Sequence, residues 1–173
     1  TVEHIPLERT IGPVVVIDAS AKALANRDYL FGPGDFLAWE KTHDRIPAGT
    51  IVLLRTGYDR YWPDAVNYLG TAERGDAAIP KLHFPGLAPE GARWLTEQRQ
   101  IKAVGLDTAS IDYGQSTLFE SHRILAKGNV PIFENLSGLG GLPPTGATLI
   151  ALPMKIEGGC GAPLRAVAWL PGR

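Results

Sequence analysis

The chain has 173 residues and a formal net charge of −1 at pH 7; 45% of its residues are hydrophobic and 20% are charged. This length fits one domain spanning 1–173 with a single core, and the composition is too apolar for a disordered chain. The balance of 17 basic against 18 acidic residues leaves no positive field to hold a polyanion, so we expect no nucleic-acid partner.

Other features of the composition concern the cellular compartment. The longest apolar runs, such as residues 14–17, are far shorter than the ~20 residues of a membrane helix. No basic-then-apolar signal peptide opens the chain. The single cysteine, Cys160, cannot form an internal disulfide and indicates a reducing compartment. We therefore expect a cytoplasmic domain without a membrane partner.

The first half of the chain alternates strand and helix patterns. A β-branched run over 14–18 predicts a buried strand, and the apolar spacing after Gly34 predicts a helix that ends near His43. Residues 50–55 (Thr-Ile-Val-Leu-Leu-Arg) form the strongest strand pattern in the sequence. Residues 56–84 are rich in Gly, Pro, Asp and Asn, and we expect a long loop, which is typical of a lid or binding surface.

The second half continues this alternation. Pro89 at a first-turn position predicts a helix that ends near Gln100, followed by a strand over 101–106 and a polar loop over 107–112. A short helix over 118–126 and a strand over 130–133 come next. Residues 147–152 and 164–169 are expected to form two antiparallel strands. This order predicts one α/β domain with a mixed sheet and helices packed on it.

His122 and Glu134 are the first candidate pair for chemistry. They lie twelve residues apart and share no helical face, but a helix-turn-strand unit can bring them together at one end of the sheet. An imidazole and a carboxylate suit a borderline divalent ion such as zinc or manganese. On spacing alone, the alternative is that His122 is a half-buried helix residue and Glu134 a solvated loop carboxylate.

The loop after the third strand contains Asp107, Ser110 and Asp112. Ligands of α/β sheets usually bind at the carboxyl ends of strands, which makes these residues candidates for a binding site. Asp and Ser also terminate strands by accepting backbone hydrogen bonds, so turn formation explains the same pattern. The residues alone leave both interpretations open.

Three segments carry a resemblance to a known family. They are residues 105–112 (Gly-Leu-Asp-Thr-Ala-Ser-Ile-Asp), 120–125 (Glu-Ser-His-Arg-Ile-Leu) and 130–136 (Val-Pro-Ile-Phe-Glu-Asn-Leu). Together they resemble the cyclase-type metal-dependent hydrolases, the family that includes kynurenine formamidase and isatin hydrolase. Residues 80–89 and 142–147 are similar to it too, and the likeness extends over nearly the whole chain. Its most specific part is His122 followed by Glu134-Asn-Leu.

This resemblance implies a swivelling β/β/α fold and a site for a divalent metal, Zn or Mn. A His and a Glu at this spacing are metal ligands in the family, which implies the same role for His122 and Glu134. Asp107 and Ser110 match the loop near the family's site, which implies a place behind the metal ligands or in the pocket, without a transferable role. The implied substrate is a small amide, an aryl formamide or a cyclic amide.

One part of the family pattern has no counterpart in this sequence. The family's other metal ligands lie in an N-terminal motif, His-x-Gly-Thr-His-x-Asp-x-Pro-x-His, whose last His is the proposed acid/base. In relatives this motif comes shortly before a segment like 1–7 (Thr-Val-Glu-His-Ile-Pro-Leu). We therefore expect an N-terminally incomplete family fold: a truncated chain, one half of a nicked protein, or a naturally short relative.

Two functions follow as hypotheses. The first is an amide hydrolase that needs the missing segment for full activity, in which Tyr58, Tyr61 and Trp62 line an aromatic pocket or belong to a core or interface. The second is a non-catalytic domain kept for binding or oligomerisation. In both, we expect a homo-oligomer or a complex with a complementary N-terminal fragment, because a shortened fold exposes sheet edges and apolar faces.

Overall fold

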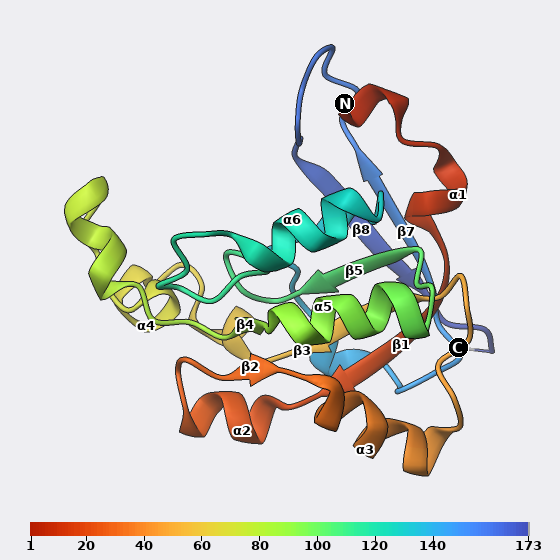
Figure 1. Ribbon diagram of the computed structural model, residues 1–173. Coiled ribbons are helices and arrows are strands. Elements are labelled where there is room, and N and C mark those ends of the chain that lie inside the picture. Colours follow the sequence, from red (N-terminus) through yellow and green to blue (C-terminus); the bar gives the residue numbers. More distant parts are fainter. Residues whose placement is uncertain (173) are drawn as a thin grey trace.

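The computed structural model describes residues 1–172, and its main feature is a curled six-stranded mixed sheet (Figure 1). The spatial order of the strands is β6-β5-β3-β1-β7-β8. Four neighbours are parallel: β1 (Ile11–Asp18), β3 (Ile51–Arg55), β5 (Ala103–Leu106) and β6 (Ile132–Phe133). Two strands extend the sheet with antiparallel pairing, β7 (Thr148–Pro153) and β8 (Leu164–Trp169). A separate parallel pair consists of β2 (Leu30–Phe31) and β4 (Gly86–Leu87).

The helices are short. The α-helices are α1 (Leu7–Thr10), α2 (Ser20–Ala25), α3 (Pro33–His43), α4 (Ala65–Leu69), α5 (Pro89–Arg93) and α6 (Glu120–Lys127). The 3-10 turns are η1 (Val2–His4), η2 (Tyr58–Tyr61), η3 (Asp76–Lys81) and η5 (Leu139–Gly141), and η4 (Trp94–Gln98) is a π-helical turn that continues α5. Within residues 1–172, no helix has the length and apolar character needed to cross a membrane.

The core lies on both faces of the parallel strands. Successive side chains of a strand point to opposite faces, so Val52 and Leu54 join one cluster while Ile51 and Leu53 join the other. Helices α3, α5 and α6 supply the first cluster, and the segment after β6 together with β7 supplies the second. All four of these β3 side chains are fully buried, which explains why this strand gave the clearest sequence pattern.

The predicted α/β class with a mixed sheet is confirmed, as are the antiparallel last two strands. The first strand begins three residues earlier than predicted. It changes partner along its length: Ile11 to Pro13 pair with β7, and Val14 to Asp18 pair with β3. The fourth strand is shorter than predicted and covers only Ile132–Phe133.

The prediction of a long loop over 56–84 was wrong in detail. This segment contains η2, α4 and η3, and η3 projects away from the sheet at the left of Figure 1. The Asp64 carboxylate caps α4 by accepting from the amides of Val66 and Asn67, and Gly70 ends the helix in the left-handed region. Helices of four to six residues are too short to show hydrophobic periodicity. The sequence pattern did not predict α2, which has six residues, for the same reason.

Candidate metal site

The candidate residues meet at the carboxyl edge of the parallel strands. The chain leaves β5, crosses the polar loop, forms α6 and returns through β6, which pairs in parallel with β5. His122 lies in the first turn of α6, and Glu134 directly follows β6. This β-α-β unit is the local reason why two residues twelve positions apart reach the same place.

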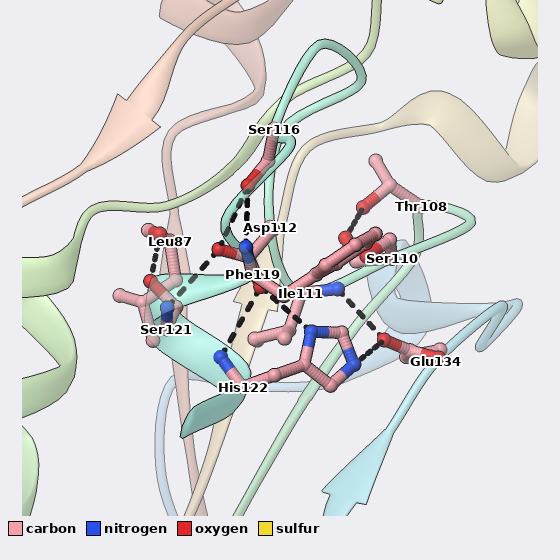
Figure 2. A network of polar contacts seen from close by, with 10 residues as sticks. All are labelled: Leu87, Thr108, Ser110, Ile111, Asp112, Ser116, Phe119, Ser121, His122 and Glu134. Carbon is pink, nitrogen blue, oxygen red and sulfur yellow. Dashed lines mark hydrogen bonds and ion pairs between the residues drawn. The ribbon is translucent and has the colours of Figure 1, made fainter. Parts of the chain in front are cut away.

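The imidazole of His122 lies between two carboxylates (Figure 2). Its Nδ1 is 2.6 Å from Oδ2 of Asp112, and its Nε2 is 3.1 Å from Oε1 of Glu134. The hydrogen bonds that His122 donates, first to Asp112 and then to Glu134, raise its pKa to about 9, although partial burial acts against this rise. The structure thus brings the predicted pair together; their role as metal ligands stays a prediction.

Asp112 organises the start of α6. Its side chain is buried and accepts hydrogen bonds from the backbone amides of Ser121 and His122, at 3.0 and 3.1 Å. Burial raises the pKa of Asp112, but the hydrogen bonds from His122 and Ser121 outweigh burial and hold it below its ordinary value. An acidic side chain is favourable at a helix N-terminus, where amides lack intrahelical partners. The same carboxylate therefore caps the helix and orients the histidine ring.

Glu134 is fixed by a main-chain contact. Its Oε1 accepts a hydrogen bond of 2.8 Å from the amide of Ile111, in the loop that also carries Asp112. About 29% of the Glu134 side chain is exposed, which leaves part of the carboxylate free to meet a ligand. The loop thus places both carboxylates around His122. It carries Asp112 itself, and its Ile111 amide holds Glu134.

Asp107 and Ser110 occupy other positions in this loop. Asp107 is fully buried, and its carboxylate accepts from the amide and hydroxyl of Thr56 and from the amide of Gly57, at 2.7–2.8 Å. Burial raises the pKa of Asp107, partly offset by these donors. The carbonyl of Ser110 accepts from the hydroxyl of Thr108. The contacts of Asp107 join the ends of β3 and β5, as the turn interpretation expected.

The aromatic residues of segment 56–84 separate into two groups. Tyr58 belongs to a buried cluster with Tyr68 and Phe84, which matches the core interpretation. Trp62 is 69% exposed. Sequence reasoning missed Tyr68, whose hydroxyl donates to Asn135 at 3.0 Å, directly beside Glu134. No sequence signal pointed to it, because Tyr68 looked like one of several loop aromatics.

An open groove adjoins Glu134. It has a volume of about 810 Å³ and runs between the segment after β6 and the inner face of β7 and β8. Its apolar lining includes Ile132, Leu136, Leu139, Leu142, Leu149 and Leu164. Glu134 thus lies at the edge of a space large enough for a small molecule or a polypeptide segment.

The donor set fits a divalent ion in type but not in number. An imidazole nitrogen and a carboxylate oxygen suit zinc or manganese, and the Asp112 contact at Nδ1 is the kind that orients metal-binding histidines. Among residues 1–172, no group of three or more His, Cys, Asp or Glu side chains is arranged to hold a metal. Asp112 faces the opposite nitrogen of His122, so the described residues offer two ligands.

The comparisons identify the family. The model of the family described as "Putative cyclase" matches residues 1–113, about two thirds of the chain. The chain belongs to this cyclase family. Among curated relatives, it is 34% identical to isatin hydrolase of Roseibium aggregatum, covering 98% of this chain and 63% of the relative. It is 32% identical to kynurenine formamidase of Paracidovorax citrulli, covering 99% of this chain and 68% of the relative.

The solved structures of cyclase-family proteins agree with this assignment. Isatin hydrolase A from Ralstonia solanacearum superposes with a TM-score of 0.88 at 38% identity, covering 97% of this chain and 63% of that one. An isatin hydrolase bound to the product analogue thioisatinate superposes with a TM-score of 0.87 at 34% identity, over 96% of this chain and 63% of that one. The expected family and its fold are therefore confirmed. The chain spans slightly less than two thirds of the length of these isatin hydrolases.

Proposed function

We propose that this chain carries part of the metal centre of a hydrolase that cleaves the C–N bond of small amides, aryl formamides or cyclic amides. The observation that carries the proposal is the placement of His122 Nε2 and Glu134 Oε1 only 3.1 Å apart at the carboxyl edge of the sheet. The names of the relatives, isatin hydrolase and kynurenine formamidase, support this substrate class.

In this proposal, His122 and Glu134 hold zinc or manganese. When bound, such an ion polarises a substrate carbonyl and lowers the pKa of a coordinated water. Asp112 accepts from Nδ1 of His122 and keeps that nitrogen protonated, so Nε2 is the nitrogen that would release its proton and offer a lone pair to a bound ion. The amide of Ile111 fixes one oxygen of the Glu134 carboxylate and leaves the other to approach an ion.

Two protein ligands are fewer than the three that catalytic zinc sites usually have. We therefore propose that the remaining ligands, and the group that moves the substrate's proton, come from outside these 173 residues. A further polypeptide segment or a second copy of the chain could supply them. The groove beside Glu134 offers such a segment a place to pack.

The test is a calorimetric titration of this chain with Zn²⁺ and with Mn²⁺. We expect weak binding that falls at least ten-fold in both His122→Ala and Glu134→Gln, because each removes one of two ligands. His43→Ala is the control, since His43 stacks on Trp39 at the end of α3 and should not affect the ion. Equal affinity in all four proteins would contradict the proposal.

A structural clamp is the competing interpretation. Both nitrogens of His122 already contact carboxylates, which would join α6, the polar loop and the end of β6 without any ion. A non-catalytic binding or oligomerisation domain needs no more than this. In that case His122→Ala should have a lower melting temperature than the wild type. Added Zn²⁺ should raise the melting temperature of neither the wild type nor the variant.

A further inference from the structure

A buried tyrosine outside the candidate site contacts the turn that carries Glu134. Tyr68 lies on α4 and is 3% exposed, packed with Tyr58 and Phe84. Its hydroxyl donates to Oδ1 of Asn135 at 3.0 Å and lies 3.5 Å from the backbone oxygen of Asp107. A buried hydroxyl needs such a partner, because an unpaired one is costly.

Asn135 has a backbone conformation that most residues avoid. Its φ is +56°, in the left-handed region, where asparagine is tolerated better than most side chains. The amide of Asn135 donates to the carbonyl of Thr108 at 2.8 Å, and the amide of Leu136 donates to that of Leu106 at 3.0 Å. Two main-chain contacts therefore hold the turn at Asn135 and Leu136, and Tyr68 adds a contact to the Asn135 side chain.

The helix that carries Tyr68 is itself anchored. Asp64 caps its first turn, and the guanidinium of Arg27 donates to the carbonyl of Asn67 at 2.8 Å. The Tyr68 hydroxyl thus approaches Asn135 from a fixed helix, although segment 56–84 is otherwise rich in turns.

From this geometry we infer that Tyr68 is a positioning residue: its hydrogen bond to Asn135 sets the turn that aims the Glu134 carboxylate at Ile111 and His122. The inference extends the proposed function, because it makes segment 56–84 a determinant of the metal site. Removing the hydroxyl leaves the Asn135 side chain free to rotate. The adjacent Glu134 carboxylate then loses its alignment with the amide of Ile111.

The experiment compares Tyr68→Phe with Tyr58→Phe. Both variants remove a hydroxyl from the same buried cluster, but only Tyr68→Phe removes the hydroxyl that bonds Asn135. The first readout is the NMR shift and hydrogen-exchange rate of the Ile111 amide, which report its bond to Glu134 without any metal. We expect the Ile111 amide to shift and to exchange about five- to ten-fold faster in Tyr68→Phe only. The second readout is Zn²⁺ affinity by calorimetry, expected to fall about ten-fold in the same variant.

The two readouts separate the two claims. An Ile111 amide that is unchanged in Tyr68→Phe, or equally changed in Tyr58→Phe, would overturn the positioning role. A wild-type chain that binds no Zn²⁺ while Ile111 still responds to Tyr68→Phe would refute the proposed metal site and leave the positioning role supported. A lowered melting temperature with Zn²⁺ affinity and the Ile111 amide both preserved would show a purely structural role and also overturn the inference.

Discussion

Asp112 shows how one carboxylate can serve a helix and a site at once. It accepts the backbone amides of Ser121 and His122 and also contacts Nδ1 of the His122 ring. The first two contacts fix where α6 begins, and the third fixes the direction of the imidazole. Because all three converge on one buried group, Asp112 orients the His122 ring although that ring is itself partly exposed.

Asp112→Asn should therefore affect both stability and the site. An asparagine amide places donors opposite backbone donors, so we expect a loss of about 1–3 kcal/mol in the free energy of unfolding. Zn²⁺ affinity should fall about 10- to 100-fold, because the ring loses its anchor. Chemical denaturation and calorimetry on the same protein check both values.

The matched control is Asp28→Asn. Asp28 contacts Nδ1 of another histidine, His83, at 2.9 Å, and both side chains are about 40% exposed. This change should leave Zn²⁺ affinity as in the wild type. An equal loss of affinity in the two variants would contradict a specific role for Asp112.

For single residues, the sequence predicted that His122 and Glu134 meet, but not which contacts hold them in place. His122 and Glu134 were selected from their spacing and the family resemblance, and they lie side by side. Asp107 and Asp112 are both acids of one loop, and the family resemblance placed Asp107 and Ser110, rather than Asp112, near the site. Only the fold separates them, because Asp107 points to Thr56 and Gly57 while Asp112 points to His122.

Among the elements, the short strand β4 sets the position of the loop that carries Asp112. A Cβ added at Gly86 would lie 2.4 Å from the amide nitrogen of Tyr113 and 2.6 Å from the carbonyl carbon of Asp112. These are backbone atoms, which cannot rotate away as a flexible side chain could. Only glycine at position 86 allows β4 and the loop to approach this closely.

Gly86→Ala should displace the loop. We expect a loss of about 1–3 kcal/mol in stability, as for overpacked sites, together with a weaker Asp112–His122 contact. The comparison is Gly32→Ala, at a position where an added Cβ meets nothing within 4 Å. If the denaturation curves of the two variants coincide, the close approach of β4 to the loop does not matter for stability.

Two of the elements that sequence patterns predicted are long enough to show their pattern. Strand β3 has four fully buried residues in succession, and α3 has eleven residues. In contrast, α4 depends on the Asp64 cap and on Arg27, which is about 40 residues away in the sequence. Such a contact exists only in the folded chain, so the helix and the Tyr68–Asn135 bond it supports could not be predicted.

For the whole molecule, one nearly buried ion pair connects distant parts of the helical layer. Glu40 on α3 accepts Nε and Nη2 of Arg99 at 2.6 and 2.8 Å, and also the amide of Ile46 at 2.8 Å. Both charged side chains are only 11–12% exposed. The hydrogen bond from Arg99, against partial burial, holds the pKa of Glu40 below its ordinary value of 4.5.

This pair predicts how stability depends on pH. A carboxylate with a lowered folded pKa stabilises the protein fully above pH 4.5, and the contribution is lost as pH falls through the folded pKa. Glu40→Gln should therefore cost about 1–3 kcal/mol at pH 7. The difference from wild type should shrink as the pH drops below 4.5.

Denaturant titrations from pH 7 to pH 3 check this, with Glu73→Gln as the control. Glu73 pairs with Lys81 at the surface, where both side chains are about half exposed, and such pairs contribute ~1 kcal/mol at most. A pH-independent gap between Glu40→Gln and wild type would contradict the assignment.

Anomalous diffraction at the zinc edge, from crystals of this chain grown with Zn²⁺, would show directly whether His122 and Glu134 hold the ion. We expect a peak about 2.0–2.2 Å from both His122 Nε2 and a carboxylate oxygen of Glu134, with Asp112 still bound to Nδ1. A zinc-saturated crystal without a peak there, in which His122 Nε2 remains in direct contact with Glu134, would contradict it.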